Sequence, residues 1–277
     1  MDNGFAVSEV ECKSIISTSR IPSLDYSVNP YTGCQHGCVY CYARFMTRYT
    51  KHKMAWGRFA DVKINAPEVL EKQIIKLRRG RVTLSTVTDP YQPQERKYGI
   101  TRRILIELAS CGFPVSILTK SDLVLRDIDI LKRFGSGDRE VGFSMAALDE
   151  DVRANFEPCA PPVKNRIRAL KKLHSEGIKT WVFIAPVLPY LTELSIFDLL
   201  DEIKGSADHV LVDKLNIKCG NWQGISDVLM KKYPRLAPKW RDMLFSGRNR
   251  RTYCQNINRE IAEFCGENDI NVQFCKI

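Results

Sequence analysis

The sequence lacks a long apolar segment. No uninterrupted apolar stretch reaches the about 18 residues that a membrane-spanning helix needs, and no charged start is paired with the short apolar segment of a secretory signal. The ten cysteines lack the regular spacing of a disulfide framework. No internal repeat or low-complexity tract is visible either. These absences predict a cytoplasmic protein that keeps its thiols reduced and has no membrane partner.

Acidic residues are fewer than basic ones. The 277 residues include 42 Lys and Arg against 32 Asp and Glu, which gives a formal net charge of +10. Such an excess says little about the fold but favours polyanionic partners such as nucleic acid. The hydrophobic content of 44% is enough for one large domain, or for a domain with an appendage.

Three cysteines lie close together in the stretch N-P-Y-T-G-C-Q-H-G-C-V-Y-C-Y-A-R. Cys34, Cys38 and Cys41 have C-x₃-C-x₂-C spacing. Thiolates favour iron–sulfur clusters or zinc, but a structural zinc site needs four ligands and nothing nearby supplies the rest. A [4Fe–4S] cluster held by three cysteines keeps one iron open for a substrate or cofactor, and the two glycines inside the stretch give the loop the necessary backbone freedom. A zinc knuckle and three unrelated buried cysteines are the alternatives.

The cysteine motif resembles a known family signature. C-x₃-C-x₂-C with an aromatic residue, Tyr40, immediately before the last cysteine is similar to the signature of the radical S-adenosylmethionine (SAM) enzymes. The resemblance implies a [4Fe–4S] cluster and SAM as cofactors, with one electron from the cluster cleaving SAM to methionine and a 5′-deoxyadenosyl radical. It also implies an electron donor such as flavodoxin or ferredoxin. The cofactors supply this chemistry, while the protein positions and shields them.

Short apolar segments alternate with helical patterns from residue 25 onward. With the strand before the cysteine loop, they predict six β/α units and an α/β fold, an open (β/α)₆ partial TIM barrel, which is the architecture of radical SAM cores. The nearly continuous apolar strands are typical of strands covered on both faces. The predicted strands are 81–87, 114–120, 140–146, 179–187 and 209–216, and the predicted helices are 67–79, 101–111, 125–134, 163–176 and 196–204.

The pattern of predicted strands and helices divides the chain into three parts. Residues 1–24 are interpreted as an N-terminal capping segment, residues 25–216 as the barrel, and residues 217–277 as a C-terminal extension of two or three helices with a terminal apolar run at 271–275. Parallel α/β sheets place ligands at the carboxyl ends of their strands, which is where the cysteine loop is expected.

A second group of motifs identifies a branch of the family. Residues 85–95 read S-T-V-T-D-P-Y-Q-P-Q-E, and residues 157–161 read E-P-C-A-P. Together with T-R at 101–102, T-K-S at 119–121 and R-D at 126–127, they resemble the spore photoproduct lyase-like branch, over roughly residues 25–215. That lyase repairs a cross-linked thymine dimer in DNA by hydrogen abstraction, so the resemblance implies a lyase-like role in DNA repair.

The resemblance also assigns residues to SAM. Cys34, Cys38 and Cys41 match the cluster ligands, and Tyr40 matches the aromatic residue near the SAM adenine. Lys120 and Ser144 match polar residues that contact SAM, where an ammonium can pair with its carboxylate and a hydroxyl can bond its ribose. The alternatives are a solvated lysine at a strand end and a small residue that fills the core.

Two carboxylates follow the second predicted strand. Asp89 and Glu95 lie where the wider superfamily recognises the SAM amino group. Formation of a turn beside Pro90 is the alternative role for Asp89.

One position departs from the lyase. A cysteine three residues before the matching aspartate returns a hydrogen atom to the lyase substrate, with tyrosines on either side of the last cluster cysteine in the relay. Tyr40 and Tyr42 match those tyrosines as candidate catalytic residues, but Thr86 occupies the cysteine position. A threonine O–H bond is too strong to donate hydrogen as a thiol does, so dimer repair by the same relay is not expected. Tyr42 can also be a packing residue at the start of a helix.

Two basic stretches indicate the substrate. Residues 44–58 contain five Lys and Arg and no acid, and residues 231–251 contain eight against Asp242 alone; aromatic residues are interleaved in both. Cations follow phosphates and aromatic rings stack on bases, so both stretches predict contacts with nucleic acid. Solvated helix faces with inward aromatic rings are the alternative. The aromatic residues are Phe45, Tyr49, Trp56, Tyr233, Trp240 and Phe245.

The remaining cysteines are expected to be buried free thiols. Wide spacing makes a second cluster at the last four of them the weaker alternative. These seven residues are Cys12, Cys111, Cys159, Cys219, Cys254, Cys265 and Cys275.

The sequence therefore predicts a radical SAM enzyme that abstracts hydrogen from nucleic acid in a repair or modification reaction. The nearest alternative is the same chemistry on a protein side chain or a small metabolite. A third possibility is a non-catalytic nucleic-acid-binding module with a structural or redox-sensing cluster.

Overall fold

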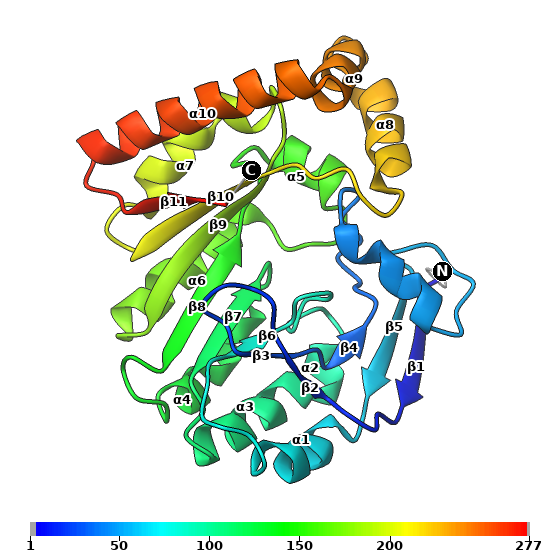
Figure 1. Cartoon of the computed structure of the whole chain (residues 1–277), viewed down its shortest axis with the longest axis vertical. Coiled ribbons are helices and arrows are strands. Elements are labelled where there is room, and N and C mark those ends of the chain that lie inside the picture. The colour runs from blue at the N-terminus through cyan, green and yellow to red at the C-terminus, as the bar shows by residue number, and fades with distance from the viewer. Residues whose placement is uncertain (1–3, 276–277) are drawn as a thin grey trace.

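A curved parallel sheet carries most of the chain in the computed structural model, which describes residues 4–275 (Figure 1). The first three and last two residues, which belong to the predicted terminal segments, lie outside the described part. Strands β3, β6, β7, β8, β9 and β10 are parallel neighbours in that order. Their bounds are Tyr26–Val28, Val82–Leu84, Val115–Thr119, Arg139–Ser144, Lys179–Val187 and His209–Lys214. This order confirms the predicted open (β/α)₆ partial barrel.

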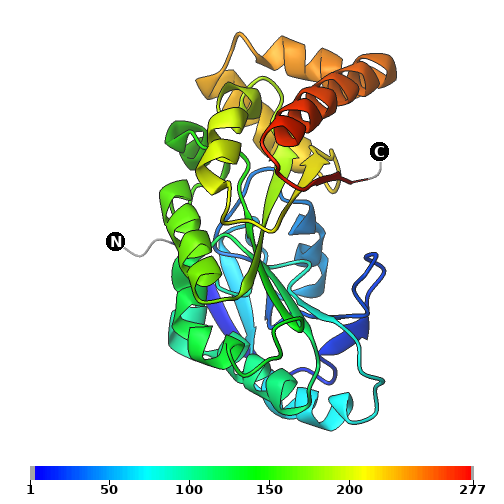
Figure 2. The ribbon, with the colours of Figure 1, turned by 90° about the vertical axis from the view of Figure 1, so that its left-hand side faces the viewer.

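Helices cover the outer face of this sheet (Figure 2). Apolar residues recur along one face of each connecting helix, and that face packs on the strands; in α6, for example, Ile167, Leu170 and Leu173 are all buried. The connecting helices are α1 (Ala66–Ile74), α3 (Ile100–Ser110), α4 (Ile128–Leu131), α6 (Val163–Ser175) and α7 (Ile196–Ile203).

The inner face of the sheet is not covered in the same way. Along β9, Val182 and Ile184 point to the helices and are buried, whereas Phe183 and Ala185 on the opposite face are only half-buried. On that same face Trp181 and Val187 are buried, so β9 meets the expectation of strands covered on both faces only in part. Strand β6 and the last four residues of β8 are buried on both faces and confirm it.

Several elements differ from the sequence prediction. The predicted helix at 125–134 is instead a 3₁₀ helix, η2 (Asp122–Asp127), followed by the short α4, because Arg126 and Asp127 are fixed by ion pairs described below. The sequence prediction also missed α2 (Glu95–Tyr98), α5 (Glu150–Phe156) and a strand, β5 (Phe59–Lys63).

A small second sheet supports the cysteine loop. Strand β1 (Ala6–Val10) pairs in parallel with β5, which also pairs with the short β4 (Tyr31–Thr32). A further strand from the predicted capping segment, β2 (Ile16–Thr18), is antiparallel to β3 at one edge of the large sheet. Because β4 leads directly into the cysteines, the small sheet fixes one end of their loop.

The C-terminal segment extends the large sheet as well as adding helices. After α8 (Asn221–Lys232) and α9 (Ala237–Phe245), the long α10 (Gly247–Glu267) packs with Ile257, Ile261 and Cys265 buried. It leads into β11 (Val272–Phe274), which is parallel to β10. None of the helices in residues 4–275 has both the length and the apolar character needed to cross a membrane.

Candidate active site

The cysteine loop lies between β4 and a 3₁₀ helix, η1 (Tyr42–Tyr49). Cys34 and Cys38 are buried and Cys41 is half-buried. The loop is made of tight turns, in which the Gly37 amide donates to the Cys34 carbonyl at 3.3 Å and the Cys41 amide donates to the Cys38 carbonyl at 3.1 Å. These turns gather three soft ligands within one short loop.

Burial and mutual repulsion affect the pKa values of the cysteine thiols. Burial raises the pKa of the Cys34 thiol, and Asp89, Cys38 and Cys41 raise it further. Burial likewise raises the pKa of Cys38 to about 12, although Lys120 opposes this effect. A bound metal holds such thiols as thiolates, so the group fits an iron–sulfur cluster.

The arrangement differs from a site for one metal ion. Within the described residues, no group of three or more His, Cys, Asp or Glu side chains is placed to hold a single ion. The ligands of a [4Fe–4S] cluster meet a different requirement, because each thiolate binds its own iron. His36, inside the loop, is turned toward Asp89, with Nδ1 at 3.3 Å from the carboxylate.

Gly33, at the entrance to the loop, provides a test of its geometry. Its φ is +87°, and an added Cβ would lie 2.5 Å from the Phe59 carbonyl oxygen on β5. We expect Gly33→Ala to destabilise the protein by about 3 kcal/mol or more, from the strained φ and the backbone clash together. Gly112→Ala is the matched control, because Gly112 has a φ of +70° with nothing within 4 Å; we expect it to cost only about 1 kcal/mol. Urea unfolding measures both, and equal losses would contradict this account.

Asp89 connects several segments around the site through hydrogen bonds. Its carboxylate accepts hydrogen bonds from the Thr119 hydroxyl at 2.7 Å, from the Lys120 amide at 2.8 Å and from the Tyr91 amide at 2.9 Å. Burial alone would raise the pKa of Asp89, but His36 and these hydrogen bonds lower it to about 2. Asp89 therefore ties the loop after β6 to the end of β7 and to the cysteine loop, and its oxygens are already occupied by protein donors.

Lys120 and Ser144 meet close to Asp89. The sequence prediction places Lys120 at the end of the third apolar strand segment, when the strand before the cysteine loop is counted as the first, and Ser144 within the next segment, 140–146. The Lys120 ammonium donates to the Ser144 hydroxyl at 2.8 Å and lies 3.8 Å from a Glu157 carboxylate oxygen. Tyr40 donates its hydroxyl to the same Glu157 oxygen, and the ammonium lies 5.8 Å from the Tyr40 ring centroid. Arg166 donates to the other Glu157 oxygen at 2.5 Å. One network thus joins Lys120, Ser144, Tyr40, Glu157 and Arg166.

Two cations of the network share one carboxylate. Lys120 and Arg166 are both cationic, and Glu157 pairs with both. Burial lowers the pKa of Lys120, but Glu157, Cys38 and Asp89 act in the opposite direction, and the pKa lies above its usual value. The ammonium is therefore kept next to the cysteine loop, where it can pair with a bound anion.

Glu157 and Arg166 were not assigned by sequence reasoning. Glu157 belongs to the E-P-C-A-P motif quoted above, so the motif marked it without indicating a partner. Arg166 has 0% exposure and also donates to the Ser144 carbonyl at 2.8 Å, yet in the sequence it is one of several basic residues on a surface helix. No local signal distinguishes it.

Tyr42 lies beside the position that departs from the lyase. Its hydroxyl donates to the Thr86 carbonyl, and its side chain is 48% exposed. Asn29 accepts from the Thr86 amide at 2.9 Å and holds the same loop. The structure therefore brings Tyr42 and Thr86 together and gives Tyr42 a hydrogen bond, whereas its exposure does not fit the alternative of a buried packing residue.

The branch-specific residues form a buried ion-pair network. Glu95 has 0% exposure and accepts from the Tyr31 hydroxyl, from the Thr101 amide at 2.9 Å and from Arg126 at 2.7 Å. Arg126 also binds Asp127, with Nε at 2.8 Å from the carboxylate. Glu95 is thus fully engaged inside the protein, and its place in the motif is explained by support of the loop between β6 and α3.

The outer half of this network continues to the surface. Arg102 bridges Asp127 at 2.9 Å and Asp129 at 2.6 Å, and Tyr91 donates its hydroxyl to Asp127 at 3.1 Å. Removing one partner from such a buried network leaves an unpaired charge and is costly, typically about 3–5 kcal/mol. The T-R and R-D motifs therefore fix the backbone that carries Asp89.

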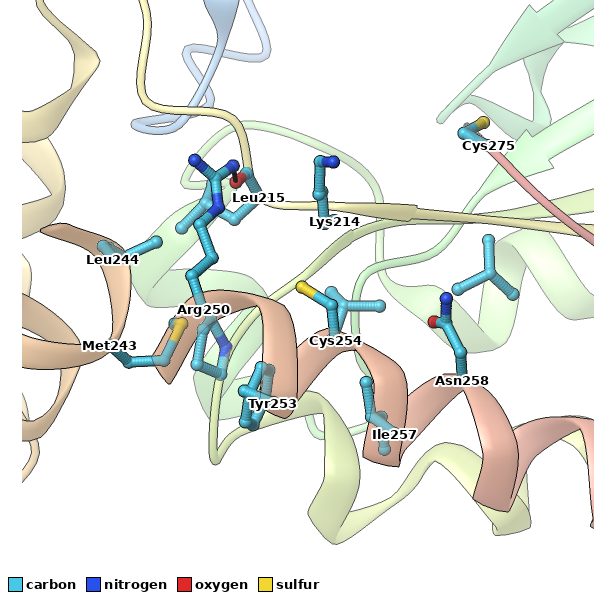
Figure 3. A pocket seen from close by; sticks show the side chains of 13 residues that line it. Lys214, Leu215, Met243, Leu244, Arg250, Tyr253, Cys254, Ile257, Asn258 and Cys275 are labelled. Carbon is cyan, nitrogen blue, oxygen red and sulfur yellow. Dashed lines mark hydrogen bonds between the residues drawn. The ribbon is translucent and has the colours of Figure 1, made fainter. Parts of the chain in front are cut away.

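Within residues 4–275, the remaining cysteines do not gather into a second cluster site. Cys254 on α10, Cys275 after β11 and Lys214 are among the residues that line a pocket of about 20 Å³ (Figure 3). Such a volume holds about one water molecule. Cys265 is buried elsewhere on α10, whereas Cys111, Cys159 and Cys219 are exposed. The expectation of buried thiols is correct for Cys254 and Cys265 and wrong for the three exposed residues.

The two basic stretches lie at different distances from the cysteine loop. The first continues from Cys41 through η1. The second begins in the last turn of α8, whose opposite end, Asn221, donates to the Tyr40 carbonyl at 2.8 Å. Some of the interleaved aromatic rings face inward: Trp240 is buried and stacks on Phe156. Trp56 and Tyr233 also pack on Phe rings, whereas Tyr49 is 74% exposed and Phe245 is 58% exposed.

The half-open barrel and the three-cysteine loop at its strand ends define the radical SAM class. The model of the Radical SAM superfamily matches residues 28–203, and the chain belongs to this superfamily. Its members use a [4Fe–4S] cluster and SAM. The three thiols of one short loop and the Lys120 ammonium beside them are of the kinds that these cofactors need as ligands.

Related sequences cover most of the chain. An uncharacterized protein of Methanocaldococcus jannaschii is 35% identical over 234 residues, which is 84% of this chain and 86% of that protein. An uncharacterized protein of Mycobacterium tuberculosis is 30% identical over 88% of this chain and 75% of its own length. The Radical SAM Nalpha-GlyT isomerase of Pseudomonas phage M6 is 24% identical over 66% of this chain and 38% of its own length.

Solved structures share the fold. Spore photoproduct lyase in complex with dinucleoside spore photoproduct superposes with a TM-score of 0.63 at 18% identity; the match covers 83% of this chain and 66% of the lyase. SuiB of Streptococcus suis bound to S-adenosylmethionine matches with a TM-score of 0.59 at 12% identity, over 98% of this chain and 50% of SuiB. Both neighbours confirm the predicted architecture.

Proposed function

We propose that this radical SAM enzyme abstracts hydrogen from a nucleic-acid substrate in a repair or modification reaction. The observation that carries the proposal is the presence of two basic stretches with interleaved aromatic residues, the first of which leads directly out of the cysteine loop. Radical initiation follows from the family, whereas the substrate is inferred from these two basic stretches. An external one-electron donor such as flavodoxin or ferredoxin completes the system.

The proposed cofactor contacts follow from the site. Cys34, Cys38 and Cys41 hold the cluster, which with SAM supplies the 5′-deoxyadenosyl radical. Lys120 binds the SAM carboxylate, because its ammonium is kept next to the cysteine loop, where it can pair with a bound anion. Ser144 presents a hydroxyl to the same ligand from the neighbouring strand, and Tyr40 lines the adenine side. Asp89 is proposed to position its neighbours and not to bind SAM directly, because its oxygens already accept hydrogen bonds from the protein.

The second basic stretch suits a phosphate backbone. In the second basic stretch, the exposed cations take part in no ion pair among the described residues; they are Lys231, Lys232, Arg235, Lys239, Arg241, Arg248 and Arg251. Phe245 contacts Trp222 edge to face at 5.1 Å and exposes 58% of its surface, which leaves an aromatic ring among these cations. Such a combination binds unpaired bases and their phosphates.

The fate of the substrate radical differs from that in the lyase. Spore photoproduct lyase is solved with a dinucleoside photoproduct, which supports a nucleotide-type substrate for this related fold. Thr86 stands at the position of the lyase hydrogen-donating cysteine, beside Tyr42, and its hydroxyl cannot replace a thiol. We therefore propose a nucleic-acid reaction other than dimer repair by the same relay. A base within a duplex has to be flipped out to reach the site.

Binding of DNA and RNA over a salt series tests the substrate class. We expect Lys239→Glu combined with Arg241→Glu to weaken binding at least tenfold at low salt and to reduce the salt dependence, because each lost phosphate contact lowers the slope by about 0.9. The matched control, Lys72→Glu with Lys76→Glu, makes the same charge change on exposed residues at the end of α1. Equal losses in both double variants, or affinity that does not depend on salt, would count against a nucleic-acid substrate.

The alternatives predict different results. A protein or small-molecule substrate predicts 5′-deoxyadenosine formation under anaerobic reduction that added nucleic acid does not stimulate. SuiB solved with its precursor peptide, with a TM-score of 0.52, supports the peptide alternative. A non-catalytic binding module predicts salt-dependent binding without any 5′-deoxyadenosine.

A further inference from the structure

Three consecutive backbone carbonyls of the cysteine loop are held by side chains. The Val39 carbonyl accepts from Arg44 Nη2 at 2.7 Å, and the Cys41 carbonyl accepts from Arg44 Nε at 3.2 Å. The Tyr40 carbonyl between them accepts from Asn221 Nδ2 at 2.8 Å. Arg44 belongs to η1, but Asn221 comes from α8, far along the chain, so the loop is held from two independent elements.

Asn221 is fully engaged and fully buried. It has 0% exposure, and its amide nitrogen also donates to the Asn216 carbonyl at 2.9 Å, while its amide oxygen accepts from the Lys218 amide at 3.0 Å. Every strong hydrogen-bonding group of the side chain therefore has a partner. The amide can occupy this place in one orientation only, because two carbonyls face its nitrogen and one N–H faces its oxygen.

The turn that presents Asn221 is strained. Cys219 has a φ of +55°, which is unusual for a residue with a side chain, and Gly220 follows with a φ of +76°. Gly220 also accepts from Arg44 Nη1 at 3.4 Å, so the turn is tied to the same arginine that holds the loop. Strain of this kind persists only where surrounding contacts fix it, and it concentrates at functional sites.

We propose that Asn221 and Arg44 are positioning residues for the cluster, and that α8 is the element through which the C-terminal segment sets the ligand geometry. The Tyr40 carbonyl and the Cys41 amide share one peptide plane. Asn221 holds the carbonyl end of this plane, and the Cys38 carbonyl holds the amide end at 3.1 Å. With the plane fixed at both ends, the directions of the Cys41 thiol and the Tyr40 ring are fixed as well. This inference concerns the cluster and does not depend on the substrate.

Asn221→Asp is the sharpest test, because it keeps the size of the side chain but replaces the donor with an oxygen that faces two carbonyls. We expect the anaerobically reconstituted variant to lose its cluster to a ferrous-iron chelator about tenfold faster than the wild type. We also expect a broadened electron paramagnetic resonance spectrum of the reduced cluster, with a weakened response to SAM. Asn155→Asp is the matched control, since Asn155 donates to the Tyr233 hydroxyl and does not touch the cysteine loop.

A second variant decides the outcome if Asn221→Asp does not fold. Arg44→Lys keeps the charge but cannot hold the Val39 and Cys41 carbonyls together, and we expect it to accelerate cluster loss about threefold to tenfold. Cluster loss and spectra that match the wild type in the folded Asn221→Asp variant would overturn the proposal. If that variant fails to fold, faster cluster loss in Arg44→Lys than in the wild type supports the proposal. An unchanged rate of cluster loss in Arg44→Lys overturns it. Circular dichroism establishes folding before each comparison.

Discussion

Replacement of Cys38 by serine is expected to abolish 5′-deoxyadenosine formation, with a fall of at least about a thousandfold. A serine hydroxyl is not deprotonated at neutral pH and is a hard ligand, so the cluster loses one of its three protein bonds. The iron content after anaerobic reconstitution should fall in parallel, because Cys38 is buried and no other described cysteine shares its loop apart from the two remaining ligands. Quantifying iron and 5′-deoxyadenosine in the same sample links cluster loss to activity.

Cys111→Ser is the control for this prediction. Cys111 is exposed at the end of α3, so its replacement should change neither the iron content nor the reaction. Full activity in Cys38→Ser with normal iron content would contradict the assignment of the ligands. A loss of activity in both variants would instead indicate damage to the protein during reconstitution.

Replacement of Lys120 by methionine should raise the dissociation constant for SAM about 30-fold to 100-fold. The methionine keeps much of the side-chain volume but removes the ammonium that we propose binds the SAM carboxylate, and a charge-assisted hydrogen bond contributes about 2–3 kcal/mol. The fold should persist, because the Glu157–Arg166 pair at 2.5 Å remains intact and balanced without Lys120. Equilibrium dialysis with labelled SAM on the cluster-loaded protein measures the change.

Two variants separate SAM binding from structural damage. Lys72→Met removes an exposed lysine on α1 and should leave the affinity for SAM unchanged. Glu157→Gln should destabilise the fold by about 3 kcal/mol, because it leaves Arg166 buried without its partner. A normal dissociation constant in Lys120→Met would remove Lys120 from the SAM site and leave it as a member of the ion network alone.

The sequence was informative where the chemistry is local. Cys34, Cys38 and Cys41 lie within one short loop, so their spacing alone indicates the cluster. The alternation of strands and helices likewise predicted the order of the six parallel strands, because each β/α unit is contiguous in the chain. The ends of β7 and β8 then place Lys120 and Ser144 side by side, at 2.8 Å between their polar atoms.

Long-range partners could not be predicted in this way. The requirement for glycine at residue 33 arises from Phe59, on a strand that the sequence prediction missed. Asn221 looks like an ordinary polar residue at a helix start, and its partner, the Tyr40 carbonyl, is a backbone group that carries no sequence signal. Contacts of this kind depend on the folded chain and are invisible to spacing or periodicity.

The residues that mark the branch most specifically are not the residues that lie closest to the cysteine loop. Glu95, Arg126 and Asp127 help to mark the lyase-like branch, yet they bind one another away from solvent, with Glu95 and Asp127 at 0% exposure. A buried ion network tolerates few substitutions, because each member leaves an uncompensated charge when it is removed. Residues that identify a branch can therefore be retained because they stabilise a loop, and they then carry little information about the substrate.

The position of Asn221 in the chain has a consequence for biogenesis. The ribosome releases the three cysteines early, but the Tyr40 carbonyl has to wait for its partner until most of the chain has been made. Iron delivered before α8 docks meets a loop in which the Tyr40 carbonyl lacks this partner. If Asn221 positions the cluster as proposed, we expect stable insertion of the cluster to follow docking of α8, and a chain interrupted before residue 221 to retain every thiol ligand but to hold its iron poorly.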